Sequence, residues 1–545
     1  MLHVFAFLAV SYILGVFASP QVRIGRTQLT GLTLSDGIEF FGGIPYAEPP
    51  VGPRSFRRPV LKRNFNTTVF DATTYGKACM QVPIEIDVTN MSDDCLTLNI
   101  HRPSGVKPNA RLPVLFWSYG GAWSWGASST YNGSTLVSRS IERGTPVIYV
   151  NFNYRLGPFG WPQGQESEDQ GVLNLGLHDH IAALQWVQHN IHHFGGDRNK
   201  VTIFGESAGS ISNGILYLNS GLERLARGAI FQSGQANSVI NPKASYREDV
   251  WQRLIRAMPS CAATSESGSS IPCLREASSV EILTAWLQIF QEIQDFILFL
   301  PTIDPARGSL LPDYPSRLYS QGRFARIPFI SGTNLDEGTA FANSNPNATE
   351  DNIKGHIIGY NSPSPDEKGL ARVVDELFDV YPDVPSLGSP FNTGDELFGL
   401  SRSYKRHAAI LTDMVFEAPR RMWLEAATSR GVKAWSYLFK QPQPLDNPAW
   451  GVYHSSEIEF VYGQPRDQSP SARNVSTLMM DYWISFAVNL DPNDRRGLRR
   501  PTWPRYTKRD GTSLQLQGGN TTAITDNFRV QKSRFFNSHP ILFRH

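Results

Sequence analysis

The sequence feature that most constrains the fold is a serine between small residues, set between a strand-like run and a helix-like run. Val201-Thr202-Ile203-Phe204 leads directly into Gly205-Glu206-Ser207-Ala208-Gly209, and Ile211 and Ile215 follow at helical spacing. In this context the turn is sharp, and small residues let the strand and helix approach each other closely. The serine hydroxyl projects above the sheet beside the free N–H groups of a helix N-terminus. The pattern therefore predicts an α/β chain with Ser207 as a nucleophile.

Further apolar runs predict the sheet to which this turn belongs. Val114–Trp117 and Val147–Val150 are short, continuously apolar and bounded by loop residues, as in strands that helices cover on both faces. A helix is predicted over His178–His193, and it ends at the turn Phe194–Asp197. Strand, helix and strand joined by short loops form a βαβ unit, so the sheet is predicted to be mostly parallel.

The length of 545 residues corresponds to about three average domains, but no repeat or low-complexity linker divides the chain. Stretches 280–299 and 366–381 have helical patterns and lie between candidate strands, so we expect them in a cap or rim. The sequence therefore favours a single α/β domain over residues 19–545 with large cap insertions.

The amino terminus has the pattern of a secretory signal peptide. An apolar run within residues 1–18 is too short to span a bilayer comfortably and ends before the small residues Ala18 and Ser19. The alternative is an N-terminal membrane anchor. No later stretch reaches the length of a transmembrane helix. We therefore expect cleavage near Ala18 and a secreted, extracellular chain without an integral membrane segment.

Cysteines and glycosylation signals fit that compartment. The four cysteines allow three connectivities, and the local pairs Cys79–Cys95 and Cys261–Cys273 are favoured in an oxidising environment. Six asparagines stand in Asn-x-Ser/Thr triplets, which also occur by chance. They are Asn66, Asn90, Asn132, Asn347, Asn474 and Asn520.

Charge and cysteine spacing exclude several classes of partner. The net charge is +2, only 18% of residues are charged and no long Lys/Arg block occurs, so we expect no nucleic-acid partner. No Cys-x-x-Cys pair exists, and His189, His192 and His193 have no acidic ligand at matching spacing. We therefore expect no metal and no cofactor.

A serine needs a base and oxyanion donors before it can act as a nucleophile. The small residues of Ser118-Tyr119-Gly120-Gly121-Ala122-Trp123 follow the Val114 strand and expose backbone N–H groups at the carboxyl edge of the sheet. The alternative is a flexible turn at a strand end. The combination with Ser207 favours an oxyanion loop.

Several motifs beyond the serine turn occur along nearly the whole chain after residue 20. They are Phe41-Gly42-Gly43-Ile44-Pro45-Tyr46-Ala47-Glu48-Pro49-Pro50, Asp94-Cys95-Leu96-Thr97-Leu98-Asn99, Asn153-Tyr154-Arg155-Leu156-Gly157 and Phe194-Gly195-Gly196-Asp197. With Gly205–Gly209, they make the chain resemble the type-B carboxylesterase/lipase family, the cholinesterase-like α/β-hydrolases. The resemblance implies the α/β-hydrolase fold and a serine carboxylic-ester hydrolase acting on a small-molecule ester.

The resemblance also implies the remaining site residues. The family's acid matches Glu337 in Asp336-Glu337-Gly338-Thr339, with Asp336 as the local rival. The family's histidine matches His454 in Gly451-Val452-Tyr453-His454-Ser455-Ser456-Glu457. The implied oxyanion donors are the N–H groups of Gly121, Ala122 and Ala208. Ala122 departs from the family's third glycine, and its methyl group removes space beside the reacting centre.

These motifs are compared with four possible functions. An esterase for short-to-medium-chain or aryl esters leads, and a triacylglycerol lipase is the alternative. A catalytically inactive adhesion protein on the same fold would lack a triad residue, whereas Ser207, Glu337 and His454 are all present. In the family that the chain resembles, choline esterases carry a choline-binding Trp in the loop between the first two cysteines. The 15 residues between Cys79 and Cys95 contain no Trp, so a choline esterase is disfavoured.

The loop between Cys79 and Cys95 is predicted to be a short strand or flap. Apolar residues alternate with polar residues and proline from Met80 to Val88, which predicts one apolar face.

Overall fold

The computed structural model describes residues 19–34, 37–293, 295 and 297–545 of the chain. Within them an eleven-stranded sheet runs through the molecule in the order β14-β13-β12-β11-β10-β9-β7-β8-β6-β4-β3. Its strands are β3 (Leu32–Leu34), β4 (Ile38–Pro45), β6 (Thr97–Pro103), β7 (Leu112–Ser118), β8 (Ile148–Phe152), β9 (Gly196–Glu206), β10 (Gly228–Gln232), β11 (Phe329–Asn334), β12 (Ala434–Phe439), β13 (Thr512–Leu516) and β14 (Thr522–Thr525).

The middle of this sheet is parallel, as the apolar runs predict. Neighbouring strands from β8 through β7 and β9 to β13 pair in parallel, with Phe116 opposite Ile203 and Ile203 opposite Ala229. The pairs at both edges, which include β6 with β8 and β13 with β14, are antiparallel. The parallel strands are buried almost throughout, because helices cover both faces of the sheet.

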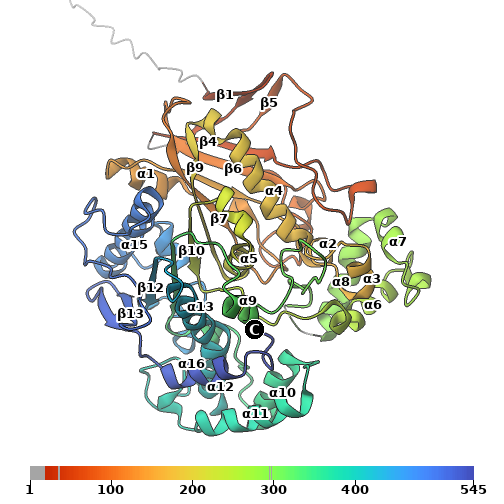
Figure 1. The fold of residues 1–545 in the computed structure, drawn as a ribbon, viewed down its shortest axis with the longest axis vertical. Coiled ribbons are helices and arrows are strands. Elements are labelled where there is room, and N and C mark those ends of the chain that lie inside the picture. The colour runs from red at the N-terminus through yellow and green to blue at the C-terminus, as the bar shows by residue number, and fades with distance from the viewer. Residues whose placement is uncertain (1–18, 35–36, 294, 296) are drawn as a thin grey trace, which may run out of the picture.

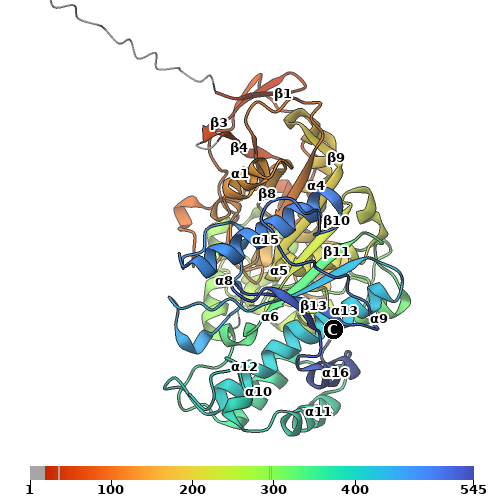
Figure 2. The same cartoon turned by 90° about the vertical axis from the view of Figure 1, so that its left-hand side faces the viewer.

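The covering helices follow the strands in alternation (Figures 1 and 2). α1 (Ser134–Glu142) and α15 (Pro470–Asn489) pack together on one face, while α4 (Leu175–Asn190), α5 (Ser207–Tyr217) and α13 (Ala418–Thr428) cover the other. These two layers and the sheet enclose the main hydrophobic core. The chain has the α/β-hydrolase architecture that the sequence predicts.

The remaining helices gather beyond the carboxyl ends of the strands. They are α2 (Gly157–Gly160), α3 (Gly164–Asp169), α6 (Glu248–Arg256), α7 (Ile271–Glu276), α8 (Ser279–Ile293), α9 (Pro315–Gln321), α10 (Glu350–Asn361), α11 (Glu367–Val380), α12 (Ser403–Leu411), α14 (Ile458–Val461) and α16 (Val530–Ser538). A second hydrophobic core joins α10, α11 and α12 to α16, which lie together at the bottom of Figure 1. These insertions surround the edge of the sheet at which Ser207 lies.

The turn between β9 and α5 depends on two glycines. A Cβ on Gly205 would lie 2.6 Å from the carbonyl oxygen of Ser118 at the end of β7, and a Cβ on Gly209 would lie 2.1 Å from the same oxygen. A side chain at either position would overlap this oxygen. The glycines therefore allow α5 to start directly against β7 and place Ser207 above the centre of the sheet.

Some predicted boundaries are wrong. The helix predicted over His178–His193 starts earlier, at Leu175, and its last turn is the 3₁₀-helix Ile191–Phe194, which ends at Gly195 with φ 85°. The helix predicted over 280–299 is observed to Ile293; residues 294 and 296 lie outside the described residues. Residues 297–300 are not helical, and the Pro at 301 disfavours a helix in the residue before it.

The segment from Met80 to Val88 is also not the predicted strand. Its described residues form bends and lead into a short 3₁₀-helix, Val88–Asn90. Met80 and Val82 are buried, whereas Ile84 is 53% exposed and Val88 is 45% exposed. The alternating apolar residues therefore do not share one buried face: Met80 and Val82 are buried and Ile86 packs partly against the core, whereas Ile84 and Val88 are exposed.

Two local disulfides join Cys79 to Cys95 and Cys261 to Cys273. A separate three-stranded sheet near the amino terminus contains β1 (Gln21–Ile24), β2 (Thr27–Thr30) and β5 (Val69–Asp71). Among the described residues, no helix combines the length and apolar character needed to cross a membrane.

Candidate functional site

Ser207 lies at the first position of α5 with a backbone φ of 52°, in the left-handed region that a serine rarely adopts. Its side chain is half-buried. A Cβ on Gly120 would lie 3.0 Å from Cβ of Ser207, so the loop after β7 borders the serine directly. Strain of this kind is typical of functional residues. The structure thus places the predicted nucleophile beside the predicted oxyanion loop.

His454 and Glu337 meet although 117 residues separate them in sequence. Nδ1 of His454 lies 2.6 Å from Oε2 of Glu337, and the imidazole is only 8% exposed. The other carboxylate oxygen of Glu337 accepts the backbone N–H of Asn334, at 2.7 Å. Both oxygens of the acid are therefore used, one to fix the acid and the other to hold the imidazole.

Asp336, the rival acid, has a different position. Its Oδ2 accepts the backbone N–H of Val452 at 2.9 Å, and its Oδ1 accepts the backbone N–H of Phe391 at 2.7 Å and the hydroxyl of Ser389 at 2.8 Å. Burial raises the pKa of Asp336 to about 6. This carboxyl group fastens the loop that carries His454 to the neighbouring segment, and Glu337 alone of the two contacts the imidazole.

Glu206 is a member of the site that sequence reasoning missed. Its Oε1 lies 3.1 Å from Nε2 of His454 and accepts the hydroxyl of Ser455 at 2.6 Å. The contact with Nε2 is a charge contact without hydrogen-bond alignment, and Nε2 has no hydrogen-bond partner among the residues described. No hydrogen bond joins Ser207 to His454 in this structure. Nε2 is thus the unused nitrogen of a ring whose other nitrogen is fixed.

Glu457 is the second residue that sequence reasoning missed. It is fully buried, and its carboxylate accepts the side-chain amides of Asn334 at 2.7 Å and Gln232 at 3.1 Å. Both Glu206 and Glu457 stand inside the motifs quoted for Ser207 and His454. Their presence there was a signal, but only the fold shows that the carboxylates of Glu206 and Glu337 contact one imidazole and that the charge of Glu457 also acts on it.

These carboxylates determine the protonation of His454. Burial lowers the pKa of its imidazole, but the negative charges of Glu206 and then Glu337 outweigh burial and raise the pKa to about 9. Burial raises the pKa of Glu206 to about 8, against the opposing charge of His454. The imidazole of His454 therefore binds a proton more tightly in this site than a free imidazole does in water.

The loop from Gly120 to Gly126, the predicted oxyanion loop, contains tight turns with positive φ values. Gly121 has a φ of 94°, and a Cβ there would lie 2.1 Å from the carbonyl oxygen of Trp125. Ala122 has a φ of 52°, so the alanine adopts a conformation that favours glycine. In the described part of the chain, the N–H groups of Gly121 and Ala122 donate to no other residue. Ala208, the third predicted donor, lies in the first turn of α5, where helix geometry leaves a backbone N–H without a partner within the helix.

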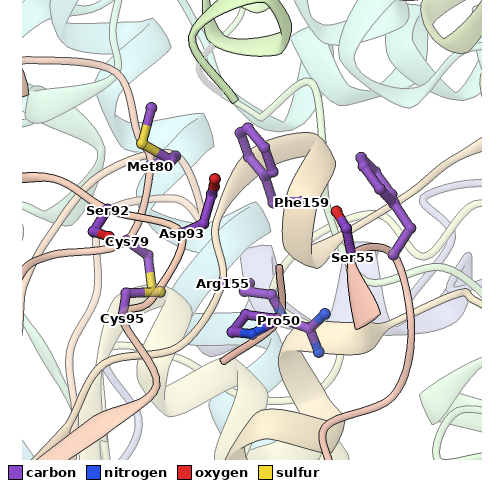
Figure 3. A pocket seen from close by; sticks show the side chains of 10 residues that line it. Pro50, Ser55, Cys79, Met80, Ser92, Asp93, Cys95, Arg155 and Phe159 are labelled. Atoms are coloured by element: carbon purple, nitrogen blue, oxygen red, sulfur yellow. A yellow bond between two sulfur atoms is a disulfide. The ribbon is translucent and has the colours of Figure 1, made fainter. Parts of the chain in front are cut away.

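Neither of two cavities in the structure contains these groups. A cavity of about 10 Å³, lined by Met80, Asp93 and Phe159 among others, lies by the Cys79–Cys95 disulfide (Figure 3) and has room for about one water molecule. A groove of about 720 Å³ on α10, α11 and α12 is lined mostly by charged side chains, including Glu350, Lys354 and Arg406.

Comparison with known proteins identifies, along nearly the whole chain, the family that the sequence motifs resemble. The model of the carboxylesterase family matches residues 18–536. Lipase 1 of Geotrichum candidum is 33% identical and is aligned over 96% of each chain. The secreted triacylglycerol lipase LIP1 of Gibberella zeae is 33% identical over 92% of this chain and 87% of its own.

Solved structures show the same architecture. The crystal structure of EstA from Aspergillus niger superposes with a TM-score of 0.82 at 25% identity, covering 97% of this chain and 99% of its own. The similarity therefore includes the cap insertions as well as the sheet.

The electrostatics predict how His454 titrates. We expect the imidazole to titrate above the value of about 6.5 for a free histidine, because carboxylates stabilise the cation. Glu206→Gln removes the largest of these charges and should lower the pKa of His454. Glu457→Gln, a matched change at a buried carboxylate that contributes less, should lower it by a smaller amount. Histidine-selective NMR titration measures both shifts, and an unchanged pKa in Glu206→Gln would contradict this account.

Proposed function

This chain belongs to the carboxylesterase family and is a carboxylic-ester hydrolase, and we propose that it acts through an acyl-enzyme on Ser207. The observation that carries the proposal is the geometry of His454. Its Nδ1 is held by Glu337 at 2.6 Å, and its Nε2 is left without a hydrogen-bond partner among the described residues at the edge of the sheet where Ser207 lies. In a Ser-His-acid triad the acid holds Nδ1 of the base in this way, and Nε2 is the nitrogen that takes the serine proton.

In the proposed mechanism the neutral imidazole of His454 is the active form, and its Nε2 removes the Ser207 proton as the hydroxyl oxygen attacks the ester carbonyl. Glu337 keeps the imidazole in the tautomer that leaves Nε2 unprotonated and stabilises the imidazolium that forms. The imidazolium then gives its proton to the leaving alcohol. Water repeats the sequence on the acyl-enzyme and releases the acid.

The N–H groups of Gly121, Ala122 and Ala208 stabilise the negative charge of the tetrahedral intermediate by hydrogen bonding. Such donors act strongly because they are fixed before the reaction in a site that excludes water. The positive φ of Ala122 supports this role, since the strained turn directs consecutive N–H groups to the same side. The methyl group of Ala122 narrows the space beside the carbonyl and disfavours bulky alcohols.

The first prediction from the proposed mechanism tests the nucleophile. Ser207→Ala should lower kcat for a soluble nitrophenyl ester by about 10⁴-fold or more, because only the oxyanion hole and substrate binding remain. Ser210→Ala is the matched control, since its hydroxyl lies on the same helix and donates to the carbonyl of Gly234. Thermal unfolding should show that both variants fold. Near-native turnover in folded Ser207→Ala would refute the assignment.

We propose short-to-medium-chain or aryl esters as the substrate class. The 15 residues between Cys79 and Cys95 are too short for a lid that reaches far across the site, and the first part of this loop is buried. The second candidate is a triacylglycerol lipase. The relatives named as lipases favour it, and so do the exposed side chains of Ile84 and Val88, which give the loop an apolar tip.

A second prediction separates these substrates. Hydrolysis of a short-chain triglyceride should rise smoothly as its concentration passes from dissolved monomer to emulsion, because a loop fixed at its base exposes little new apolar surface at an interface. Initial rates across the solubility limit measure this. A sharp increase at the onset of emulsion, with preference for long-chain oils, would instead support the lipase.

We also propose that the chain is secreted as a single domain over residues 19–545 after removal of residues 1–18. Relatives named as secreted lipases support this. Five of the six triplet asparagines are exposed, whereas Asn474 is half-buried and its side-chain amide donates to the carbonyl of Gly518 at 2.8 Å.

The third prediction concerns the product of secretion. Mass spectrometry of the protein from the culture medium of a eukaryotic host should find an amino terminus near Ser19. It should also find glycans at Asn66, Asn90, Asn132, Asn347 or Asn520, and none at Asn474, whose amide is engaged. Retention of residues 1–18 in a membrane fraction would favour an anchor instead.

A further inference from the structure

Gln81 lies between two loops that are distant in sequence. Its side chain is fully buried. Its amide nitrogen donates to the carbonyl of Gly126 at 3.0 Å and to that of Cys79 at 3.0 Å, and its amide oxygen accepts the N–H of Gly126 at 2.8 Å. The N–H of Val82 also donates to the carbonyl of Ser124, at 3.0 Å. The start of the disulfide loop is thus bonded to residues 124–126.

Those residues close the turn that holds the oxyanion donors. The carbonyl of Gly121 accepts the N–H groups of both Ser124 and Trp125, at 2.9 and 3.0 Å. Gly126 has a φ of 117°, and a Cβ on it would lie 2.7 Å from the ring of Tyr119 and 3.2 Å from the carbonyl of Gly120. The turn is closed on itself, so a displacement of Gly126 displaces Gly121 and Ala122.

The disulfide fixes the other side of this connection. Cys79 is buried two residues before Gln81 and is joined to Cys95, which leads directly into β6 of the main sheet. Figure 3 shows the disulfide with Met80 next to it. At the tip, the side chains of Ile84 and Val88 are exposed, and Ile86 between them is only partly buried against the core. The loop therefore has a base that belongs to the site and a tip that is exposed to solvent.

The geometry points to Gln81 as a positioning residue for the oxyanion hole, an inference that rests on the proposed function. Through Gly126, it holds the turn in which Gly121 and Ala122 present their N–H groups. The same bonds keep the base of the Cys79–Cys95 loop in place. Nothing in a local sequence pattern links residue 81 to residue 126.

The test compares Gln81→Leu with a matched variant. Leucine fills the space but removes all three hydrogen bonds, and we expect kcat for a nitrophenyl ester to fall about 10- to 100-fold while KM changes less than about three-fold. The affinity for a trifluoromethyl ketone, which resembles the tetrahedral intermediate, should fall in parallel. Gln441→Leu removes another buried glutamine that accepts a backbone N–H, that of Gly518, and should leave kcat unchanged.

The outcomes separate this inference from the proposed function. A wild-type protein without ester turnover would refute the proposed function itself. An active wild type with native kcat and analogue affinity in folded Gln81→Leu would overturn only the role of Gln81, and so would an equal loss in Gln441→Leu.

A measurement on the wild type keeps the inference testable if Gln81→Leu does not fold. Hydrogen exchange should protect the Gly126 amide far more strongly than the amides of residues 84–88 at the loop tip. Equal exchange at the two places would overturn the proposed anchor.

Discussion

The close contact between the end of β7 and the turn after β9 is the constraint on which the rest of the site depends. The carbonyl of Ser118 lies against both Gly205 and Gly209, and only glycines permit that approach. The contact forces Ser207 into a positive φ, a conformation that costs on the order of 1 kcal/mol or more. The packing of the buried parallel sheet offsets this cost. In return, the serine, the helix N-terminus and the loop after β7 meet at one point.

The second constraint is the burial of three carboxylates around one imidazole. A buried carboxylate is costly unless hydrogen bonds or opposite charge compensate it. Asn334 donates to both Glu337 and Glu457, Ser455 donates to Glu206, and the imidazole of His454 lies against the carboxylates of Glu206 and Glu337. The geometry of the acid and the base thus arises from one connected network. Removing Glu206 or Glu337 changes the proton affinity of His454.

The cap connects this network to the second hydrophobic core. A π-helical turn over Thr412–Glu417 follows α12, and such turns are frequent at functional sites. The hydroxyl of Thr412 accepts the N–H of Gly338 beside the acid at 2.9 Å, and the ring of Phe416 packs 4.8 Å from that of His454. The insertions therefore support the acid and the base as well as surrounding the substrate.

The sequence by itself determined the α/β fold, the strand–turn–helix at Ser207 and the loop after β7, because these depend on local periodicity and on glycines a few residues apart. Resemblance to a family added Glu337 and His454. Only the tertiary structure decided that Asp336 fastens a loop and that Glu206 joins the network. It also decided that the segment after Cys79, predicted to be a short strand or flap, is a loop bonded at its base to residues 124–126. Burial and contacts between residues a hundred or more positions apart set these roles, and neither has a local signature in the sequence.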